Sequence, residues 1–272
     1  GQAVSTIKAA TTALETGATF LEQAAAVATS ALETNTIPAK SYFEEKVGEN
    51  GAVVTTAQEL KDAINSGKET IVVYGKIDYS ETISLHANQK LVGTEYFTGY
   101  TGKEKFSQLN FSGSLEFAIK IQAKNTLISD LAISQESNSE NVVTTIYTLA
   151  QGTKLSNLDI KSLSHDSSQS DGGQGAIAAW GYDIELDGVI NINGKGRFGG
   201  GIFLYETKLV INSGSTLNLR TEESQGIDNA IMMYMSTVEV WGTVNIQNSG
   251  NGFFTSLNNR FNLHNGAILN IS

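Results

Sequence analysis

The sequence predicts an all-β fold, a right-handed parallel β-helix (β-solenoid) with an N-terminal α-helical segment and a capping helix. One observation is a set of similar apolar strands ending at Ile133, Ile160, Ile192, Leu219, Ile246 and Ile271, which lie 27, 32, 27, 27 and 25 positions apart. The other is the content of 27 Gly and one Pro, which suits a chain with many tight corners. Repeats of 20 to 50 residues indicate a solenoid, because a single coil buries its inward side only by stacking on its neighbours.

A second set of short apolar strands opens each repeat. A β-sandwich also alternates and turns often, but it does not return the same strand at nearly fixed spacing, so the solenoid is favoured. The opening strands are residues 118–121, 144–147, 176–180, 202–205, 231–234 and 253–255.

The N-terminal part of the chain differs from the repeats. We expect residues 1–52 to form a helical segment and connector, and residues 53–272 to form the solenoid. Within the first part, Ser5 to Glu33 has helical spacing of Ala-rich apolar positions, with a capping box at Thr19 and Glu22. Asn35 to Gly51 is predicted to be the connector.

A capping helix is expected at residues 55–67. Thr56 with Glu59 three residues later predicts its N-terminus, and Gly67 predicts its end. The β-branched run Thr70–Tyr74 follows directly, so the pattern changes there from helix to strand.

Composition excludes several classes of function. The chain has no Cys, which rules out a disulfide framework, and three dispersed His residues (His86, His165 and His264) that predict no metal site. The net charge of −10 disfavours nucleic acid as a partner. No run of 18 apolar residues is present, so no membrane insertion is expected, and no cofactor is expected. The first and last residues suggest a polypeptide that continues in both directions.

A resemblance rests on the order of features between Thr55 and Gly93: a capped helix, then Ile71–Ile77, then Leu85 and Lys90–Gly93. This order resembles the start of pectate-lyase-like β-helix proteins. The chain looks most like the pectate-lyase-like adhesive regions of bacterial cell-wall proteins, including serine-rich-repeat adhesins of gut lactobacilli, and less like autotransporter passenger domains. The resemblance implies a non-enzymatic, extracellular adhesin module at the bacterial cell surface, within a larger anchored or secreted protein, that binds host or plant glycans.

An enzyme is the alternative that the resemblance raises. Lyases of this fold place acidic Ca²⁺ ligands and an Arg base on one parallel sheet. The opening strands here offer only Lys120 and, at a corner, Glu206, and the three Arg residues (Arg197, Arg220 and Arg260) fall on different coils. A polysaccharide-degrading enzyme therefore stays a competing hypothesis, as does a passive spacer of an autotransporter or phage fibre.

An insertion between two coils, Ser162 to Gly175, is rich in Ser, Gln, Asp and Gly. This composition is typical of a flexible loop. The functional alternatives are a lip over a binding groove and a weak Ca²⁺ loop through Asp166 and Asp171.

The candidate binding surface is a row of aromatic residues. Trp180, Tyr205 and Tyr234 each lie four positions before an apolar residue of the next strand, so they should stack on successive coils. The row either fills the core or faces solvent. Side chains alternate between the two sides of a strand, which would turn Trp180 outward, but a corner can break this alternation. Five further candidates would supply polar contacts to hydroxyl or carboxylate groups: Tyr182, Lys195, Arg197, Lys208 and Arg220.

The expected ligand is a glycan, with polyuronates or sulfated polysaccharides as candidates. On a chain of net charge −10 and pI about 4.8, an anionic polysaccharide should bind better as the pH falls toward about 5, where some carboxylates are protonated. We expect the chain to be a monomer.

Overall fold

The computed structural model describes Thr11, Ala18 and residues 36–112, 115–137, 144–164, 175–196, 200–223, 229–247, 251–256 and 258–272. The chain divides into two compact units, residues 1–42 and 43–272. The boundary at 52/53 that the sequence suggests stays a prediction. In the first unit Thr11 and Ala18 are helical, as expected. The rest of the predicted helix, with Thr19 and Glu22, lies outside the described residues.

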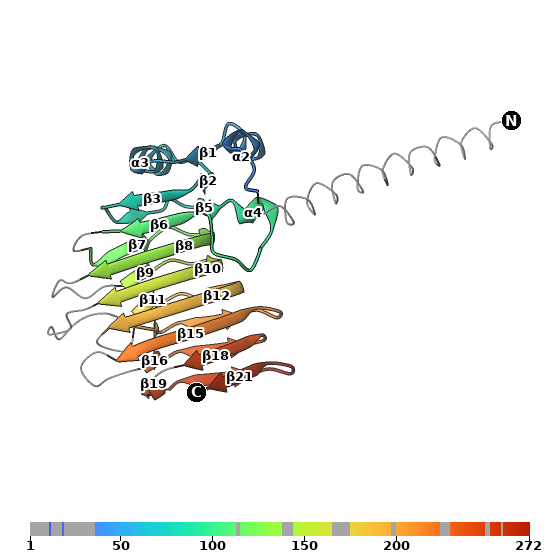
Figure 1. Ribbon diagram of the computed structural model, residues 1–272. Helices are drawn as coiled ribbons and strands as arrows, with labels where there is room; N and C mark the ends of the chain where they lie inside the picture. The colour runs from blue at the N-terminus through green and yellow to red at the C-terminus, as the bar shows by residue number, and fades with distance from the viewer. Residues whose placement is uncertain are drawn as a thin grey trace. The chain divides into compact units, whose positions relative to one another are not determined.

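Residues 43–272 form an all-β parallel β-solenoid (Figure 1). One sheet has seven strands, and every pair within it is parallel. Its strands are β4 (Ile83–Ser84), β7 (Phe117–Ile121), β9 (Thr144–Thr148), β11 (Gly175–Trp180), β13 (Ile202–Tyr205), β16 (Asn229–Tyr234) and β19 (Asn251–Ser256).

The other sheet has 14 strands and consists of two halves. The first half contains β1 (Gly51–Val54), β2 (Thr70–Val73), β5 (Lys90–Gly93), β14 (Lys208–Ile211), β17 (Thr237–Val240) and β20 (Arg260–Leu263). The second half contains β3 (Lys76–Tyr79), β6 (Gln108–Phe111), β15 (Thr216–Glu223), β18 (Thr243–Gln247) and β21 (Ile268–Ile271). Three long strands run through both halves: β8 (Leu127–Ser137), β10 (Thr153–Ser164) and β12 (Ile184–Gly196).

Each long strand turns from the first half into the second at one residue of positive φ. These residues are Asp130 (φ 59°), Asn157 (φ 47°) and Gly188 (φ 61°), and the ladder between β10 and β12 shifts register at this point. Asn, Asp and Gly tolerate this left-handed conformation better than other residues do. The bend therefore gives each coil three faces: the seven-stranded sheet and the two halves of the 14-stranded sheet.

The predicted repeats are confirmed by strand register. The closing residues pair in order, from Ile133 with Ile160 through to Ile246 with Ile271. The opening strands pair in the same way, so Ile177 has parallel partners on both sides. The parallel ladders exclude the β-sandwich alternative.

Apolar rows fill the interior of the solenoid. One row in the seven-stranded sheet is Ile119, Ile146, Ile177, Ile202 and Ile231, all at most 2% exposed. Stacking neighbouring coils removes these side chains from water, which is the main favourable term in the folding of this unit.

The capping helix is confirmed as α3 (Ala57–Asn65). Thr56 Oγ1 accepts a hydrogen bond from the Glu59 amide at 3.2 Å, as predicted, whereas the Glu59 carboxylate reaches Thr55 N at 2.7 Å instead of closing on Thr56. Leu60 on the inner side of α3 is fully buried in the main core. The helix thus covers apolar side chains at the start of the coil stack.

The expected connector, Asn35 to Gly51, contains regular structure. Residues 40–47 form helix α2 (Lys40–Val47), and Gly51 begins β1, which pairs with β2. Phe43 of α2 is fully buried against Val53 and Val72 of these strands. With one buried residue in eight, the helix carries too little apolar periodicity to be recognised from sequence. The four-residue helix α4 (Glu95–Thr98) is also too short to show apolar periodicity in the sequence.

Candidate functional site

The predicted aromatic row forms on the seven-stranded sheet. Trp180 pairs in register with Tyr205, and Tyr205 with Tyr234. The Trp180 and Tyr205 rings stack with centroids 4.6 Å apart and planes 26° from parallel. The equal spacing from the following apolar strand therefore predicted the stacking correctly.

The row lies on the outside of the sheet. The preceding residues, Ala179, Leu204 and Met233, are fully buried in the core, whereas Trp180, Tyr205 and Tyr234 are partly exposed and absent from it. Strand alternation continues to the corner, so the side chain after a buried position points outward. Of the two orientations left open by the sequence, the outward one is observed.

The structure extends this row to six rings, which we call the aromatic face: Phe117, Tyr147, Trp180, Phe203, Tyr205 and Tyr234. Phe117 and Tyr147 stack at 4.6 Å with planes only 9° apart. Tyr147 lies edge-on to Trp180 at 6.5 Å, and Phe203 contacts Trp180 at 5.9 Å and Tyr234 at 5.6 Å. The aromatic face thus runs continuously over β7, β9, β11, β13 and β16.

Sequence reasoning missed three members of this face. Tyr147 and Phe203 occupy the outward position beside the inward Ile146 and Ile202, and they pair in register with Ala178. Alternation within each opening strand could have identified both. Phe117 had no such signal, because it lies at the start of β7.

Two charged side chains, Lys120 and Glu116, act on the rings of the aromatic face. Lys120 Nζ lies 5.3 Å from the centre of the Phe117 ring, within the range of a cation–π contact. Burial raises the pKa of the Tyr147 hydroxyl, and the nearby Glu116 carboxylate adds to this effect. The Tyr147 hydroxyl is therefore a hydrogen-bond donor at neutral pH.

The other expected polar partners lie on different stretches of the coil. Lys208 lies on β14 of the first half and forms an ion pair with Asp183 at 3.3 Å, and the half-exposed Tyr182 precedes Asp183 in the turn after β11. Lys195 is near the end of β12, paired in register with Glu222, and Arg220 is on β15. Residues near in sequence separate because each coil turns through three faces.

Two predicted elements fall outside the described residues. Arg197 is one, and the outer part of the expected loop, with His165, Asp166 and Asp171, is the other. The insertion is shorter than expected at its start, because Ser162–Ser164 continue strand β10. Within the described ranges, no three His, Cys, Asp or Glu side chains come together as a metal site would require.

A groove of about 600 Å³ follows the second half of the 14-stranded sheet, and we call it the asparagine groove. Its floor is a chain of side-chain hydrogen bonds of 2.7–2.8 Å, in which each amide donates to the residue on the preceding coil. Arg220 and Lys161 line the same groove as Glu104 and Asp159. The residues of the hydrogen-bonded chain are Asp159, Asn191, Asn218, Asn245 and Asn270.

Comparison with known proteins found no matching family model, no matching curated protein and no matching solved structure. In the part of the chain that the structure describes, no helix is long and apolar enough to cross a membrane. The functional argument therefore depends on the geometry of the solenoid faces.

Proposed function

We propose that this chain is a non-enzymatic carbohydrate-binding module of a bacterial surface adhesin, and that it binds an extended glycan along the aromatic face. The observation that carries the proposal is the continuous contact of six partly exposed rings over five neighbouring strands. Large exposed apolar patches on folded proteins commonly mark binding sites. Tyr and Trp suit this role, since each combines an apolar ring with a hydrogen-bond donor.

The spacing of the rings supports a polymer as the ligand. Neighbouring coils stand about 4.8 Å apart, which is close to the length of one hexose residue. A glycan lying along the coil stack could therefore place successive sugars on successive coils, with ring faces against Trp180 and Tyr205. A row of partly exposed rings is less suited to a small ligand, which needs enclosure for affinity.

Binding without catalysis is favoured by the side chains on this face. The residues in register with Tyr147 and Phe203 are Lys120, Ala178 and Met232, none of which can act as the carboxylate of a lyase or hydrolase. The Glu116 carboxylate near Tyr147 is a single acid, whereas hydrolases of this kind use a pair. A degrading enzyme would produce unsaturated or reducing ends from a uronate polymer, and a binding module would leave the polymer intact. A passive spacer would give no signal on a glycan array.

The asparagine groove is a second candidate location for the same function. Arg220 and Lys161 would favour an anionic polysaccharide there, while Glu104 and Asp159 oppose it. A glycan of polygalacturonate or chondroitin sulfate type should bind this groove more tightly at about pH 5 than at neutral pH, as general repulsion from the acidic chain weakens. Affinity that is flat or rises with pH would argue against an anionic ligand.

The decisive comparison uses the two Trp residues: Trp180 ends β11 of the seven-stranded sheet, and Trp241 lies in the turn after β17. Trp180→Ala should weaken glycan binding about tenfold or more, because it removes the central ring of the aromatic face. Trp241→Ala is the matched control, since Trp241 is half-exposed and follows β17 of the 14-stranded sheet. Both variants would be titrated, by calorimetry, with the glycans that a glycan array identifies for the parent chain.

The outcomes separate the candidate locations. Equal loss in both Trp variants, or none in Trp180→Ala, contradicts binding at the aromatic face. Loss in Arg220→Ala alone would assign the glycan to the asparagine groove. The proposed surface location is tested by protease accessibility on intact cells, and the expected monomer by a sedimentation mass near 29.0 kDa.

A further inference from the structure

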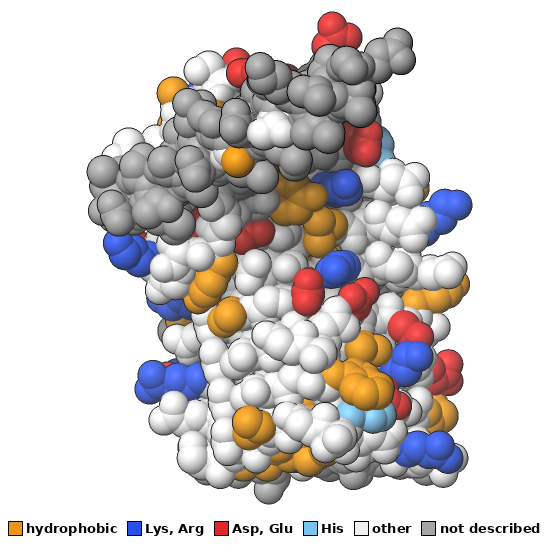
Figure 2. Space-filling view, turned by 90° about the vertical axis from the view of Figure 1, so that its right-hand side faces the viewer, with side chains coloured by type: hydrophobic (Ala, Val, Ile, Leu, Met, Phe, Trp, Pro, Cys, Tyr) orange, Lys and Arg blue, Asp and Glu red, His pale blue; other side chains and the backbone are white. Residues whose placement is uncertain are grey.

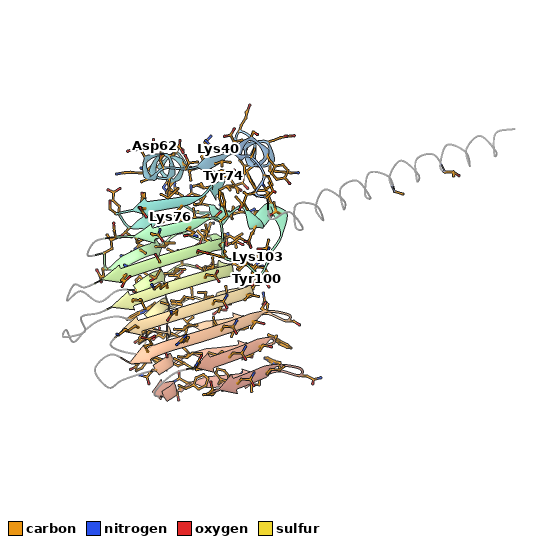
Figure 3. The ribbon with its side chains drawn as sticks, viewed as in Figure 1. Lys40, Asp62, Tyr74, Lys76, Tyr100 and Lys103 are labelled. Carbon is orange, nitrogen blue, oxygen red and sulfur yellow. The ribbon has the colours of Figure 1, made fainter. Side chains whose placement is uncertain are left out.

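A cavity of about 380 Å³ lies on the first half of the 14-stranded sheet, away from the aromatic face. One wall is α4 with the segment that follows it, including Tyr96 and Tyr100. The other wall is formed by the starts of β8, β10 and β12. Figure 3 shows Tyr100 on the segment after α4, close to these strand starts.

The inner wall contains a buried carboxylate with one unused oxygen. Asp130 is 4% exposed and sits at the bend of β8. The Ser129 hydroxyl donates to Asp130 Oδ2, whereas Oδ1 has no hydrogen-bond partner among the described residues. A buried carboxylate oxygen without a donor costs free energy, so such an atom at the wall of a cavity indicates a place for a ligand that donates.

The charges around the cavity favour a cation. Glu95 forms a buried ion pair with Lys105 at 3.3 Å, so its charge is already balanced. Lys154 is shared between Asp187 at 3.5 Å and Glu185 at 3.7 Å. Of the described residues that line the cavity, Glu95, Asp130 and Asp187 are acidic and Lys154 is basic, and this excess of negative charge attracts a positive group. Figure 2, which shows the molecule from this side, has both signs of charge interspersed on the surface.

The mouth of the cavity is suited to the same chemistry. Tyr96 and Tyr100 are 38% and 43% exposed there. The Lys105 ammonium already lies 4.9 Å above the Tyr100 ring, so the chain itself places an ammonium group on this aromatic surface. Ammonium groups are attracted to aromatic faces and to carboxylates, and this cavity presents both.

We propose that this cavity, the Asp130 pocket, binds a primary ammonium group, with Asp130 Oδ1 as its acceptor and the tyrosines at the mouth contacting the rest of the ligand. A divalent metal ion fits less well, because the acidic side chains that line the cavity are not close enough to one another, within the described residues, to hold one. An amino sugar and a linear polyamine both carry the required group. The pocket does not depend on glycan binding at the aromatic face.

Calorimetry with four probes tests the pocket: a glucosamine oligosaccharide, its N-acetylated counterpart, 1,4-diaminobutane and CaCl₂. Binding of either free amine, with the acetylated sugar and Ca²⁺ at least about tenfold weaker, is the expected result, since acetylation removes the positive charge. Whichever amine probe binds more tightly, the glucosamine oligosaccharide or 1,4-diaminobutane, indicates whether the natural ligand is an amino sugar or a polyamine. Equal binding of the acetylated sugar, preference for Ca²⁺, or no binding of either amine would overturn the proposal.

Asp130→Asn supplies the residue-level test and should weaken amine binding about tenfold or more. The variant is expected to fold, because Asn157 occupies the corresponding bend on the next coil with a similar φ. Asp62→Asn is the matched control: it removes the same charge from the exposed surface of α3. Unchanged amine affinity in Asp130→Asn, or an equal loss in Asp62→Asn, would contradict the assignment. Retention of amine binding in Trp180→Ala separates this site from the aromatic face.

Discussion

Single polar residues on this solenoid have two different relations to stability. In the asparagine groove each amide donates a hydrogen bond to the side chain on the preceding coil, so the side chains support the stack. Asp130 differs, because its buried Oδ1 has no partner within the described residues. Sites that bind ligands often retain such unfavourable groups, and replacing them stabilises the protein at the expense of binding.

The first prediction concerns the stability of Asp130→Asn. Burial is the main cause that raises the pKa of the Asp130 carboxyl, and the Glu95 charge adds to it, whereas the Ser129 hydroxyl, the Lys105 charge and the Asn157 side chain oppose it. A raised folded-state pKa means that Asp130 favours folding when it is protonated, below its unfolded pKa of about 3.9, and that this advantage is lost as the pH rises through the folded-state pKa. Asp130→Asn should therefore be at least as stable as the parent chain at neutral pH.

Urea unfolding at about pH 4 and about pH 7.5 measures this effect. The parent chain should lose stability relative to Asp130→Asn between the two pH values. A variant that is clearly less stable than the parent at the higher pH would indicate that the charged carboxylate has a stabilising partner, and would weaken the case for the pocket as well.

At the scale of elements, the capping helix depends on one hydroxyl. Thr56 accepts the Glu59 amide at the N-terminus of α3, and Leu60 of the same helix is buried in the core. Thr56→Ala should cost about 1 kcal/mol of unfolding free energy, as is typical for loss of an N-cap. Gln58→Ala on the exposed side of α3 is the control, and chemical denaturation of both variants is the measurement. A cost as large for Gln58→Ala would show that the cap is not the cause.

Close contact between coils also restricts which residue types can occur at the corners. A Cβ added at Gly201 would lie 1.8 Å from the carbonyl oxygen of Ala230, on the next coil. Since that atom belongs to backbone, it cannot move without shifting β16. Glycine at this corner is thus required by the approach of two coils and not by its own φ.

For the whole solenoid, stability depends on how completely each coil is covered by its neighbours. Ile177 lies in β11 between two parallel partners and is fully buried, whereas Ile268 in β21 is 51% exposed. Ile177→Ala should lower the unfolding free energy by about 2–5 kcal/mol, and Ile268→Ala by at most about 1 kcal/mol. Urea unfolding of the pair tests this. Similar costs at both positions would contradict a stack stabilised by nearest-neighbour coils.

Much of the fold followed from the sequence, because a solenoid repeats its pattern. The positions of Ile133, Ile160 and Ile192 define the coil, and the Thr56–Glu59 spacing defines the capping helix, through local rules that need no knowledge of distant contacts. Helix α2 could not be predicted in this way. Its one buried residue, Phe43, is stabilised by strands β1 and β2, which are separate in sequence.

The candidate sites were also predicted only in part. Equal offsets in the sequence were enough to stack Trp180, Tyr205 and Tyr234, since vertical neighbours in a solenoid are set by the repeat. Only the tertiary structure decided that these rings face solvent, that Lys208 and Arg220 lie on other faces, and that Asp130 is buried beside Tyr100. The physical reason is that the repeat determines which residues stack, whereas burial depends on how the coil bends and on which non-repeating segments pack against it.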